Sequence, residues 1–385
     1  MLDAELIVDL PMLEGLRSEW DALAVACGLP LMSPAWILAW WSHLAPVTAQ
    51  PRVVAVRDGG ELVGLAPFFV EPDDRRHRVD YRLPGIELSA RLAPLARPGR
   101  EWQVARAIAA ALSSADPRPD VIALEGAPVT SPWPLAFRET WPGPLRPVVR
   151  QYNVYGCPTI ALRGGSFDAW LNGKSANFRG QMRRLRRQFE SAGGSARVST
   201  IETVRSDVDT LVRLHSSRWK HLGESNLVAF GDRLAPMLED VGRRQLADGR
   251  FDLRLLEIDG EPVSAQLFLH AGGQALYVNS GWDERFASFK PPMLGILGTI
   301  EDAFARGEER IDLGLGEQAY KLRFADGSDP VAWTIVVPAR LRLPVTRLRT
   351  ASLLGRVLVR DTAKRMLSRE HADRLQALRG RLRGR

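Results

Sequence analysis

Two stretches of the chain, 200 residues apart, share the same alternation of apolar and polar positions. Residues 53–69 read VVAVRDGGELVGLAPFF, and residues 253–269 read LRLLEIDGEPVSAQLFL. In each stretch a half-buried strand runs into an Asp/Gly turn, and a second strand begins with Glu61 or Glu261. Glycine supplies the positive φ that a two-residue hairpin turn requires. The pattern therefore predicts two β-hairpins.

The segments around the two hairpins also correspond. Apolar residues at helical spacing precede each hairpin, and a helix and a strand follow it. The predicted helices before the hairpins are 12–28 and 33–45, then 206–223 and 232–249; the following elements are 101–113 with 120–125, and 292–306 with 310–314. This shared order predicts an α/β fold with two tandem units, each a mixed twisted sheet flanked by helices. We place the units at 1–155 and 156–338, followed by a basic helical tail, 339–385.

A helix between the two hairpins carries an apolar stripe and many arginines. In residues 174–194 the apolar side chains recur at helical spacing, and Ser175 can cap the helix start. The stripe is Phe178, Met182, Leu185 and Phe189, and the arginines are Arg179, Arg183, Arg184, Arg186 and Arg187. Five arginines without a nearby acid indicate either a solvated helix face or a surface that binds phosphate groups.

The chain's positive charge is concentrated in its tail. Residues 340–385 contain 14 lysines and arginines but only 3 acids, so the rest of the chain carries a net charge of −4 although the whole carries +7. Leucines interleaved with these arginines predict a basic amphipathic helix that contacts anionic lipid at the membrane surface. Packing of the helix against the body and binding of RNA are the alternatives.

Composition and cysteine usage narrow the class of protein. A hydrophobic content of 45% and a charged content of 25% are typical of a soluble globular protein. The N-terminus shows no signal-peptide pattern, and no apolar run is long enough to cross a bilayer. The only cysteines are Cys27 and Cys157, too few for a disulfide framework or a cysteine-rich metal site. We expect a cytoplasmic protein with peripheral membrane contact and no metal.

Common nucleotide and catalytic motifs are incomplete. Residues 173–175 read Gly-Lys-Ser, but Asp168 stands where a P-loop needs its first glycine. Residues 314–319 follow a strand and fit Gly-x-Gly-x-x-Ala, yet neither a parallel βαβ unit nor the expected acid comes after them. No nucleophile elbow occurs, and the six histidines show no metal-ligand spacing. The sequence argues against metal and nucleophilic-serine chemistry.

Four stretches carry a family resemblance through their order. They are NFRGQMRRLRRQFE, LHSSRWKHLG, YVNSGWDERFASFKPPMLG and IDLGLGEQAYKLRFA. Residues 160–325, in which they lie, resemble the acyltransferase region of the CelD/FemX-like branch of the GNAT superfamily of N-acetyltransferases. FemX-like members contain two GNAT folds in tandem, which agrees with the repeat. Residues 70–100 offer no comparable loop and helix start, so we expect the first unit to be non-catalytic and to shape the acceptor cleft.

The resemblance implies a donor site for acetyl-CoA or another acyl-CoA. The strand end Asn279, Ser280 and Gly281 would hold the thioester, and the loop 288–294 would hold the pyrophosphate through Ser288, Phe289, Lys290, Pro292, Met293 and Leu294. Proline suits a helix start, whose exposed N–H groups attract anions. Lys290-Pro291-Pro292 replaces the family's Ser-Pro-Gly, which removes the glycine that eases close backbone approach to a phosphate.

Residues 311–329, IDLGLGEQAYKLRFADGSD, are named the closing segment. By the resemblance they form the far edge of the active site. Acyl transfer needs a base, an acid and a group that stabilises the oxyanion. Tyr320 is the candidate acid, Lys321 the charge stabiliser, and Asp312 and Glu317 the candidate bases. The structural alternatives are a core-edge tyrosine, a solvated lysine and an aspartate that points to solvent.

Candidate substrate-binding residues lie on two helices. They are Arg179, Arg183, His215, Arg218 and Trp219, and helix packing is an equal alternative for His215 and Arg218. Trp36, Trp40 and Trp41 are spaced as core residues of a helix rather than as a sugar platform.

Three functions remain open. The first is acyl-CoA-dependent transfer to an amine or hydroxyl of a small molecule or glycan, in cell-envelope or exopolysaccharide biosynthesis. The second is FemAB-like aminoacyl transfer from aminoacyl-tRNA, for which the arginine helix and basic tail would bind RNA. The third is a non-catalytic scaffold in a polysaccharide-synthesis complex.

Overall fold

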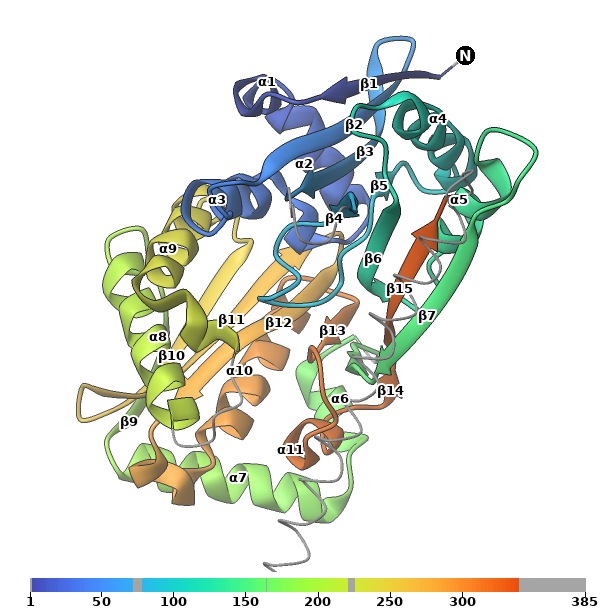
Figure 1. The fold of residues 1–385 in the computed structure, drawn as a ribbon. Helices are drawn as coiled ribbons and strands as arrows, with labels where there is room; N and C mark the ends of the chain where they lie inside the picture. The colour runs from blue at the N-terminus through green and yellow to red at the C-terminus, as the bar shows by residue number, and fades with distance from the viewer. Residues whose placement is uncertain (1, 72–77, 164, 221–225, 339–385) are drawn as a thin grey trace, which may run out of the picture. The chain divides into compact units, whose positions relative to one another are not determined.

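The computed structural model describes residues 2–71, 78–163, 165–220 and 226–338 (Figure 1). The basic tail predicted at 339–385 lies outside the described residues, and with it the predicted membrane contact. Within the described part, no helix is both long and apolar enough to span a membrane.

The first sheet is mixed and has eight strands. Its order is β1-β2-β3-β4-β6-β15-β7, with β5 paired to β3. The strands are β1 (Asp3–Ile7), β2 (Gln50–Asp58), β3 (Glu61–Val70), β4 (Asp80–Arg82), β5 (Leu95–Ala96), β6 (Val121–Pro128), β7 (Val148–Tyr155) and β15 (Val331–Val337). The helices around it are α1 (Leu10–Glu14), α2 (Arg17–Ala26), η1 (Pro30–Met32), α3 (Pro34–His43), α4 (Glu101–Ser114) and α5 (Trp133–Thr140). We call this sheet and its helices the first lobe.

The second sheet is also mixed and has seven strands in the order β14-β8-β13-β12-β11-β10-β9. The strands are β8 (Pro158–Ala161), β9 (Gly194–Val198), β10 (Phe251–Ile258), β11 (Glu261–Ala271), β12 (Gln274–Trp282), β13 (Arg310–Asp312) and β14 (Gly327–Ser328). The helices of this second lobe are α6 (Phe167–Asn172), α7 (Ala176–Ser191), α8 (Val204–Lys220), η2 (Asn226–Arg233), α9 (Leu234–Gln245), η3 (Glu284–Phe289), α10 (Pro291–Ala305) and α11 (Ala319–Leu322).

The lobes repeat one α/β plan, as the hydrophobic pattern predicts. The hairpins β2–β3 and β10–β11 are antiparallel, and each is followed by a helix and by a strand parallel to its neighbour, β4 with β6 and β12 with β13. The predicted α/β fold with two mixed sheets flanked by helices is therefore confirmed. One helix differs from expectation: the stretch 12–28 contains the end of α1 and the whole of α2, which are separated at Gly15 and Leu16.

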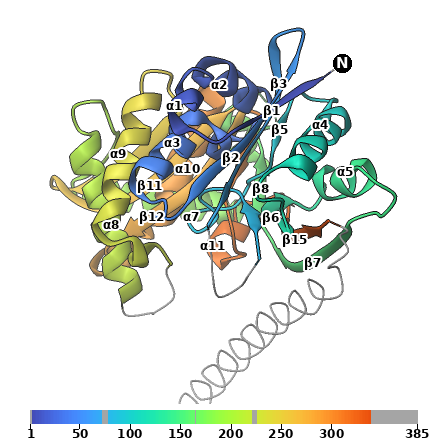
Figure 2. The ribbon, with the colours of Figure 1, turned by 45° about the horizontal axis from the view of Figure 1, so that its top comes forward.

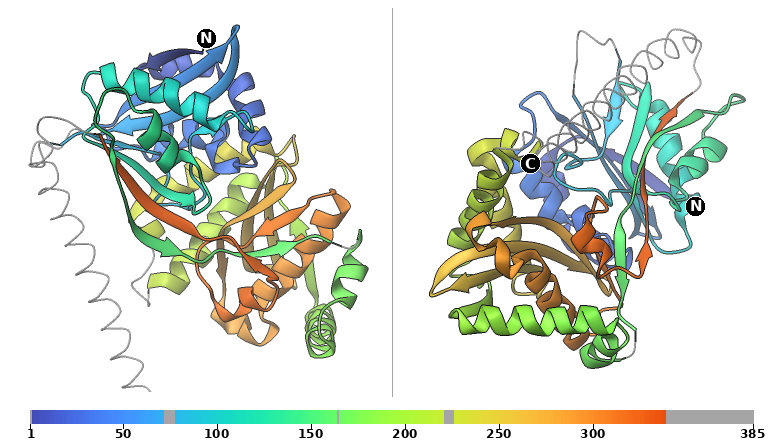
Figure 3. Two further views of the ribbon diagram at one scale, coloured as in Figure 1. Left: turned by 90° about the vertical axis from the view of Figure 1, so that its right-hand side faces the viewer. Right: turned by 90° about the horizontal axis from the view of Figure 1, so that it is seen from below.

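One strand crosses between the lobes. After β14 the chain returns to the first sheet, where β15 inserts between β6 and β7 (Figure 3). The first sheet thus contains a strand, β15, that lies beyond the boundary predicted at residue 155.

The two faces of the second sheet belong to different cores. On one face α8 and α9 pack together with the first lobe, and α3 lies against α9 (Figure 2). On the other face α7 and α10 cover the sheet through Met182, Leu185, Ile296 and Ile300. Trp36 and Trp40 are buried in the shared core, as predicted, and Trp41 is half-buried against it. Because one core serves both lobes, residues 1–338 form one compact unit.

Candidate active site

The parallel strands at the centre of the second lobe soon diverge. β12 and β13 pair only over residues 274–276 and 310–312, after which β12 continues to Trp282 paired with β11 on its other side. At the point of divergence Gly314 has φ +69°, and a β-carbon there would lie 2.7 Å from the carbonyl oxygen of Tyr277. Glycine is needed because any larger residue would combine a disfavoured backbone with a clash. The closing segment therefore leaves β13 while remaining in contact with β12.

Backbone hydrogen bonds fix the closing segment to β8 and to the residues before it. The amides of Leu313 and Gly316 donate to the carbonyls of Pro158 and Gly156 at 2.9 and 3.0 Å. Further along, Asp326 N donates to Thr159 O at 3.0 Å, and Asp329 N donates to Cys157 O at 2.9 Å. These main-chain bonds hold the backbone of the closing segment in place.

Lys321 is buried rather than solvated. It is 4% exposed, and its Nζ donates to the carbonyl oxygen of Leu315 at 2.8 Å and lies 5.4 Å from the ring centroid of Tyr277. Burial lowers the pKa of this amine to about 8, although Cys157 and Asp312 act in the opposite direction. The amine can therefore gain or lose a proton near neutral pH, as an acid–base or charge-stabilising group must.

Asp312 is also buried and points away from solvent. Its Oδ1 accepts a hydrogen bond from the Gly314 amide at 2.8 Å, and its Oδ2 pairs with Arg91 of the first lobe at 2.5 Å and with Arg310 at 3.5 Å. Both carboxylate oxygens are engaged, so the arrangement argues against the predicted role as general base. The solvent-facing alternative is wrong, since Asp312 is 4% exposed.

The two other candidates on the closing segment differ in exposure. Glu317 is exposed, and its carboxylate lies against Gly156. Tyr320 is half-buried at the margin of the core formed by α7 and α10. Glu317 is thus better placed than Asp312 to exchange protons with a bound substrate.

At the strand end that we expected to hold a thioester, Asn279–Gly281, the polar groups of Ser280 already bond to neighbouring residues. The Ser280 amide donates to Oδ1 of Asn279 at 2.6 Å, and the Ser280 carbonyl accepts from Nδ1 of His215 at 2.8 Å. Gly281 lies directly against the main chain of α8 at His215. The structure thus unites His215 with Asn279–Gly281, but the Ser280 amide already has its acceptor.

The start of α10 provides no free amide for a pyrophosphate. Pro291 and Pro292 carry no N–H, and the amides of Met293 and Leu294 both donate to the Lys290 carbonyl, at 2.9 and 3.4 Å. The expectation that exposed N–H groups of this helix attract an anion is therefore wrong. Pro292, Met293 and Leu294 are buried in the core, whereas Ser288 and Lys290 are exposed. Lys290 itself has a left-handed backbone, φ 50° and ψ 57°.

The arginine-rich helix α7 lies beside the same loop. Its stripe of Phe178, Met182, Leu185 and Phe189 is buried, and the Phe189 ring contacts Phe289 of η3 at 6.2 Å between centroids. Ser175 caps the helix as predicted, accepting from the Phe178 amide at 3.2 Å. The sequence pattern therefore identified both the helix and its buried face.

The exposed face of α7 combines paired and unpaired arginines. Arg186 pairs with Glu301 at 2.8 Å, and Arg179 donates to the carbonyls of Asn172 and Lys174. Among the described residues, Arg183, Arg184 and Arg187 have no acid or carbonyl partner. Arg184 lines two surface hollows of about 510 and 330 Å³, of which the larger also includes Arg187, Ser288 and Phe289 and the smaller Arg323.

The remaining substrate candidates lie on α8. Arg218 and Trp219 are in its last turn, and their side chains are outside the described part of the chain. No group of three or more histidine, cysteine, aspartate or glutamate side chains could hold a metal ion in the part of the chain that the structure describes.

Comparison with known proteins identifies the type of domain. The family model of an acetyltransferase (GNAT) domain matches residues 176–322. This range begins at the start of α7 and ends with α11, so it contains the diverging strands and the loop before α10. No curated protein sequence matches the chain.

Solved structures share the fold of nearly the whole chain. The structure of FemX has a TM-score of 0.59 and 13% identity, covering 86% of this chain and 98% of that one. The C-terminal domain of a putative lysylphosphatidylglycerol synthetase from Agrobacterium fabrum has a TM-score of 0.56 and 10% identity, covering 90% and 97%. L-PGS from Bacillus licheniformis has a TM-score of 0.53 and 12% identity, with the same coverage. At these identities the likeness shows the fold alone.

Proposed function

Because residues 176–322 form a GNAT-type acetyltransferase domain and the chain is accordingly an acyltransferase, we propose that its donor is bound through phosphates on the arginines of α7. One observation carries this proposal. The first turn of α10 has no free amide, while α7 presents Arg184 and Arg187 beside the same loop, and within the described part of the chain neither has an acid or carbonyl partner. Guanidinium groups bind phosphate oxygens in bidentate fashion and can replace backbone amides in this role.

The donor class that this arrangement favours is aminoacyl-tRNA. The acyl-CoA site that the resemblance implies would bind the pyrophosphate through free backbone amides. The first turn of α10 offers no such amide. An RNA backbone instead needs cationic side chains spread over a surface. Arg184 and Arg323 in one hollow and Arg184 and Arg187 in the other provide such a surface.

The closing segment supplies the groups for transfer. In the proposed reaction an acceptor amine or hydroxyl attacks the carbonyl carbon of the aminoacyl ester and passes its proton to Glu317. The Lys321 ammonium stabilises the oxyanion that forms. When the ester C–O bond breaks, Tyr320 donates a proton to the departing ribose oxygen. Glu317 then releases its proton to solvent and Tyr320 takes one from solvent, which restores both groups.

The acceptor is proposed to be a small molecule or glycan of cell-envelope or exopolysaccharide biosynthesis. The support is the resemblance of residues 160–325 to the CelD/FemX-like branch. His215, held by the Ser280 carbonyl beside the diverging strands, is the described residue that we assign to the acceptor side.

Acyl-CoA is the second candidate donor. It is favoured by the match to an acetyltransferase domain and by Lys290, which is exposed directly before α10. A pyrophosphate bound by Lys290 and Arg187 side chains would need no helix amide.

Binding measurements separate these donors. We expect uncharged total tRNA to bind with a strong dependence on salt, and acetyl-CoA to bind more weakly. The double variant Arg184→Ala/Arg187→Ala should weaken tRNA binding by about tenfold or more and reduce its salt dependence. Arg243→Ala is the control, because Arg243 is an exposed arginine on α9 that pairs with Glu239. Micromolar binding of acetyl-CoA without tRNA binding would replace the first donor by the second, and binding of neither would favour a scaffold.

A further inference from the structure

In the first lobe, residues 86–92 cover the point where the parallel strands β4 and β6 diverge. β4 and β6 pair in parallel only over residues 80–82 and 121–123. The chain after Arg82 then folds back over β6, and the amides of Arg91 and Leu92 donate to the Gly126 carbonyl at 2.9 and 3.3 Å. Gly126 has φ +76°, and a β-carbon there would lie 2.7 Å from Cδ1 of Ile86. Residues 86–92 thus occupy the position equivalent to the divergence in the second lobe.

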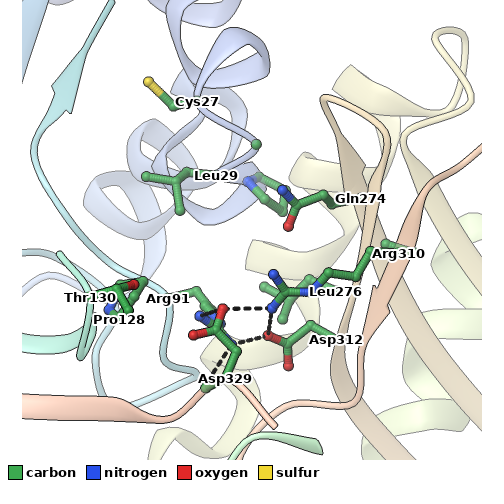
Figure 4. Close-up of a pocket in the computed structure, with 13 residues that line it drawn as sticks. Cys27, Leu29, Arg91, Pro128, Thr130, Gln274, Leu276, Arg310, Asp312 and Asp329 are labelled. Carbon is green, nitrogen blue, oxygen red and sulfur yellow. Dashed lines mark hydrogen bonds and ion pairs between the residues drawn. The ribbon is translucent and has the colours of Figure 1, made fainter. Parts of the chain in front are cut away.

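The same segment sends one side chain into the second lobe. Arg91 is 7% exposed and has φ +80°, a conformation that residues with a side chain rarely adopt. Its guanidinium pairs with Asp312 at 2.5 Å and with Asp329 at 2.8 Å, and it also donates to the Asp329 carbonyl at 2.6 Å (Figure 4). Such a backbone persists only where surrounding contacts determine it.

The two aspartates lie at the two ends of the closing segment. Asp312 is its second residue and Asp329 its last, and the segment between them carries Glu317, Tyr320 and Lys321. Arg310 pairs with the same carboxylates, at 2.7 Å from Asp329 and 3.5 Å from Asp312. The four charges border an interlobe cavity of about 160 Å³ (Figure 4). Arg310, however, belongs to β13, whereas Arg91 is a first-lobe side chain that pairs at both ends of the segment.

We infer that Arg91 is a positioning residue through which the first lobe holds both ends of the closing segment in place for the second lobe. This inference rests on the proposed function, because the segment carries the groups proposed for catalysis. The first lobe thereby has a defined role, since the segment that fills its own divergence also supports the site of the other lobe.

Electrostatics link Arg91 to Lys321. Burial raises the pKa of the Cys157 thiol to about 12; Asp312 and Asp329 raise it further, whereas Arg91 and Lys321 lower it. These four charged groups therefore all act on one buried thiol. Asp312 also raises the pKa of Lys321. Without Arg91 the charge of Asp312 is less neutralised, so Lys321 should hold its proton more tightly.

The test compares Arg91→Gln with Arg100→Gln. Arg100 is the matched control, because it pairs with Asp58 inside the first lobe at 2.8 Å. The chain has five lysines, Lys174, Lys220, Lys290, Lys321 and Lys364, so NMR of lysine labelled with 13C at Cε gives few signals. Lys321→Arg assigns the signal of interest. Amide exchange of residues 311–329 is measured by mass spectrometry on the same proteins.

In Arg91→Gln we expect the pKa of Lys321 to rise by about one unit and amide exchange in the closing segment to become about tenfold faster. The control should match the wild type. Unchanged titration and exchange would overturn the inference, as would faster exchange spread evenly over both lobes.

If Arg91→Gln does not fold, Arg91→Lys is the second variant, because lysine keeps the charge but cannot reach both carboxylates. Faster exchange confined to residues 311–329 in Arg91→Lys supports positioning, and wild-type exchange overturns it. Neither readout uses acyl transfer, so the result is independent of the donor.

Discussion

Gly314 and Tyr277 meet main chain to main chain at the point where the central strands diverge. The carbonyl oxygen of Tyr277 lies 2.7 Å from the position that a β-carbon on residue 314 would take. This contact keeps the closing segment close to β12 after β13 has ended. The position of Lys321, whose Nζ bonds to Leu315 O, depends on the same turn of the chain.

Gly314→Ala should therefore destabilise the protein and displace the closing segment. The positive φ of +69° alone costs about 1–2 kcal/mol for a residue with a side chain, and the clash with Tyr277 adds to it. Gly307→Ala is the control, since Gly307 has φ +71° but nothing within 4 Å of its β-carbon position. Urea unfolding should show a clearly larger loss for residue 314. Equal losses would mean that the Tyr277 contact relaxes without cost.

The acyl-transfer rate should fall as the pH rises through about 8. The pKa of buried Lys321 is lowered to about 8, so the ammonium that is proposed to stabilise the oxyanion loses its proton above that value. Arginine remains charged at any pH that a protein tolerates. The activity of Lys321→Arg, whatever its level, should therefore not fall near pH 8. A rate that rises through pH 8 in the wild type would instead make Lys321 a base.

Tyr320→Phe should lower turnover by about 10²-fold while leaving donor affinity nearly unchanged. General acid catalysis acts in the transition state, so loss of the hydroxyl reduces kcat rather than binding. The phenyl ring preserves the packing of this half-buried side chain against the core. Single-turnover kinetics with bound donor provide the measurement. Wild-type turnover would return Tyr320 to a packing role.

Asp329→Asn should destabilise the protein at neutral pH but much less in acid. Burial alone would raise the pKa of Asp329, but Arg91 and Arg310 outweigh it and lower the pKa. A carboxylate with a lowered folded-state pKa stabilises the fold above its unfolded pKa and loses this contribution as the pH falls through the folded value. We expect a loss of about 1.5–3 kcal/mol at pH 7, the range for hydrogen bonds to charged groups. Unfolding curves at several pH values, with Asp58→Asn in the first lobe as comparison, provide the check.

Local patterns predicted the elements of this fold well because they report on burial. The repeat of 53–69 at 253–269 identified both hairpins, and the spacing from Phe178 to Phe189 identified α7 and its buried face. Such patterns reflect which side of a strand or helix faces apolar neighbours, and the neighbours need not be known.

Contacts between distant segments were beyond this kind of inference. Nothing in the sequence near Arg91 indicates that it reaches Asp312 and Asp329, more than 200 positions later. The burial of Lys321 was missed for the same reason, since a lone lysine after a tyrosine resembles a solvated one. The lack of two amide donors at the start of α10, however, follows from the sequence itself, because Pro291 and Pro292 have no N–H group.

The crossing strand β15 has a consequence for how this protein can be divided. A break near residue 155 leaves residues 156–338 with a strand whose partners, β6 and β7, are on the other fragment. Cutting after β14 instead removes from the first lobe the strand that joins β6 to β7, and in both cases the core shared with α8 and α9 is opened to water. The two lobes should therefore fold only when they are expressed together, either as one chain or as two fragments that associate.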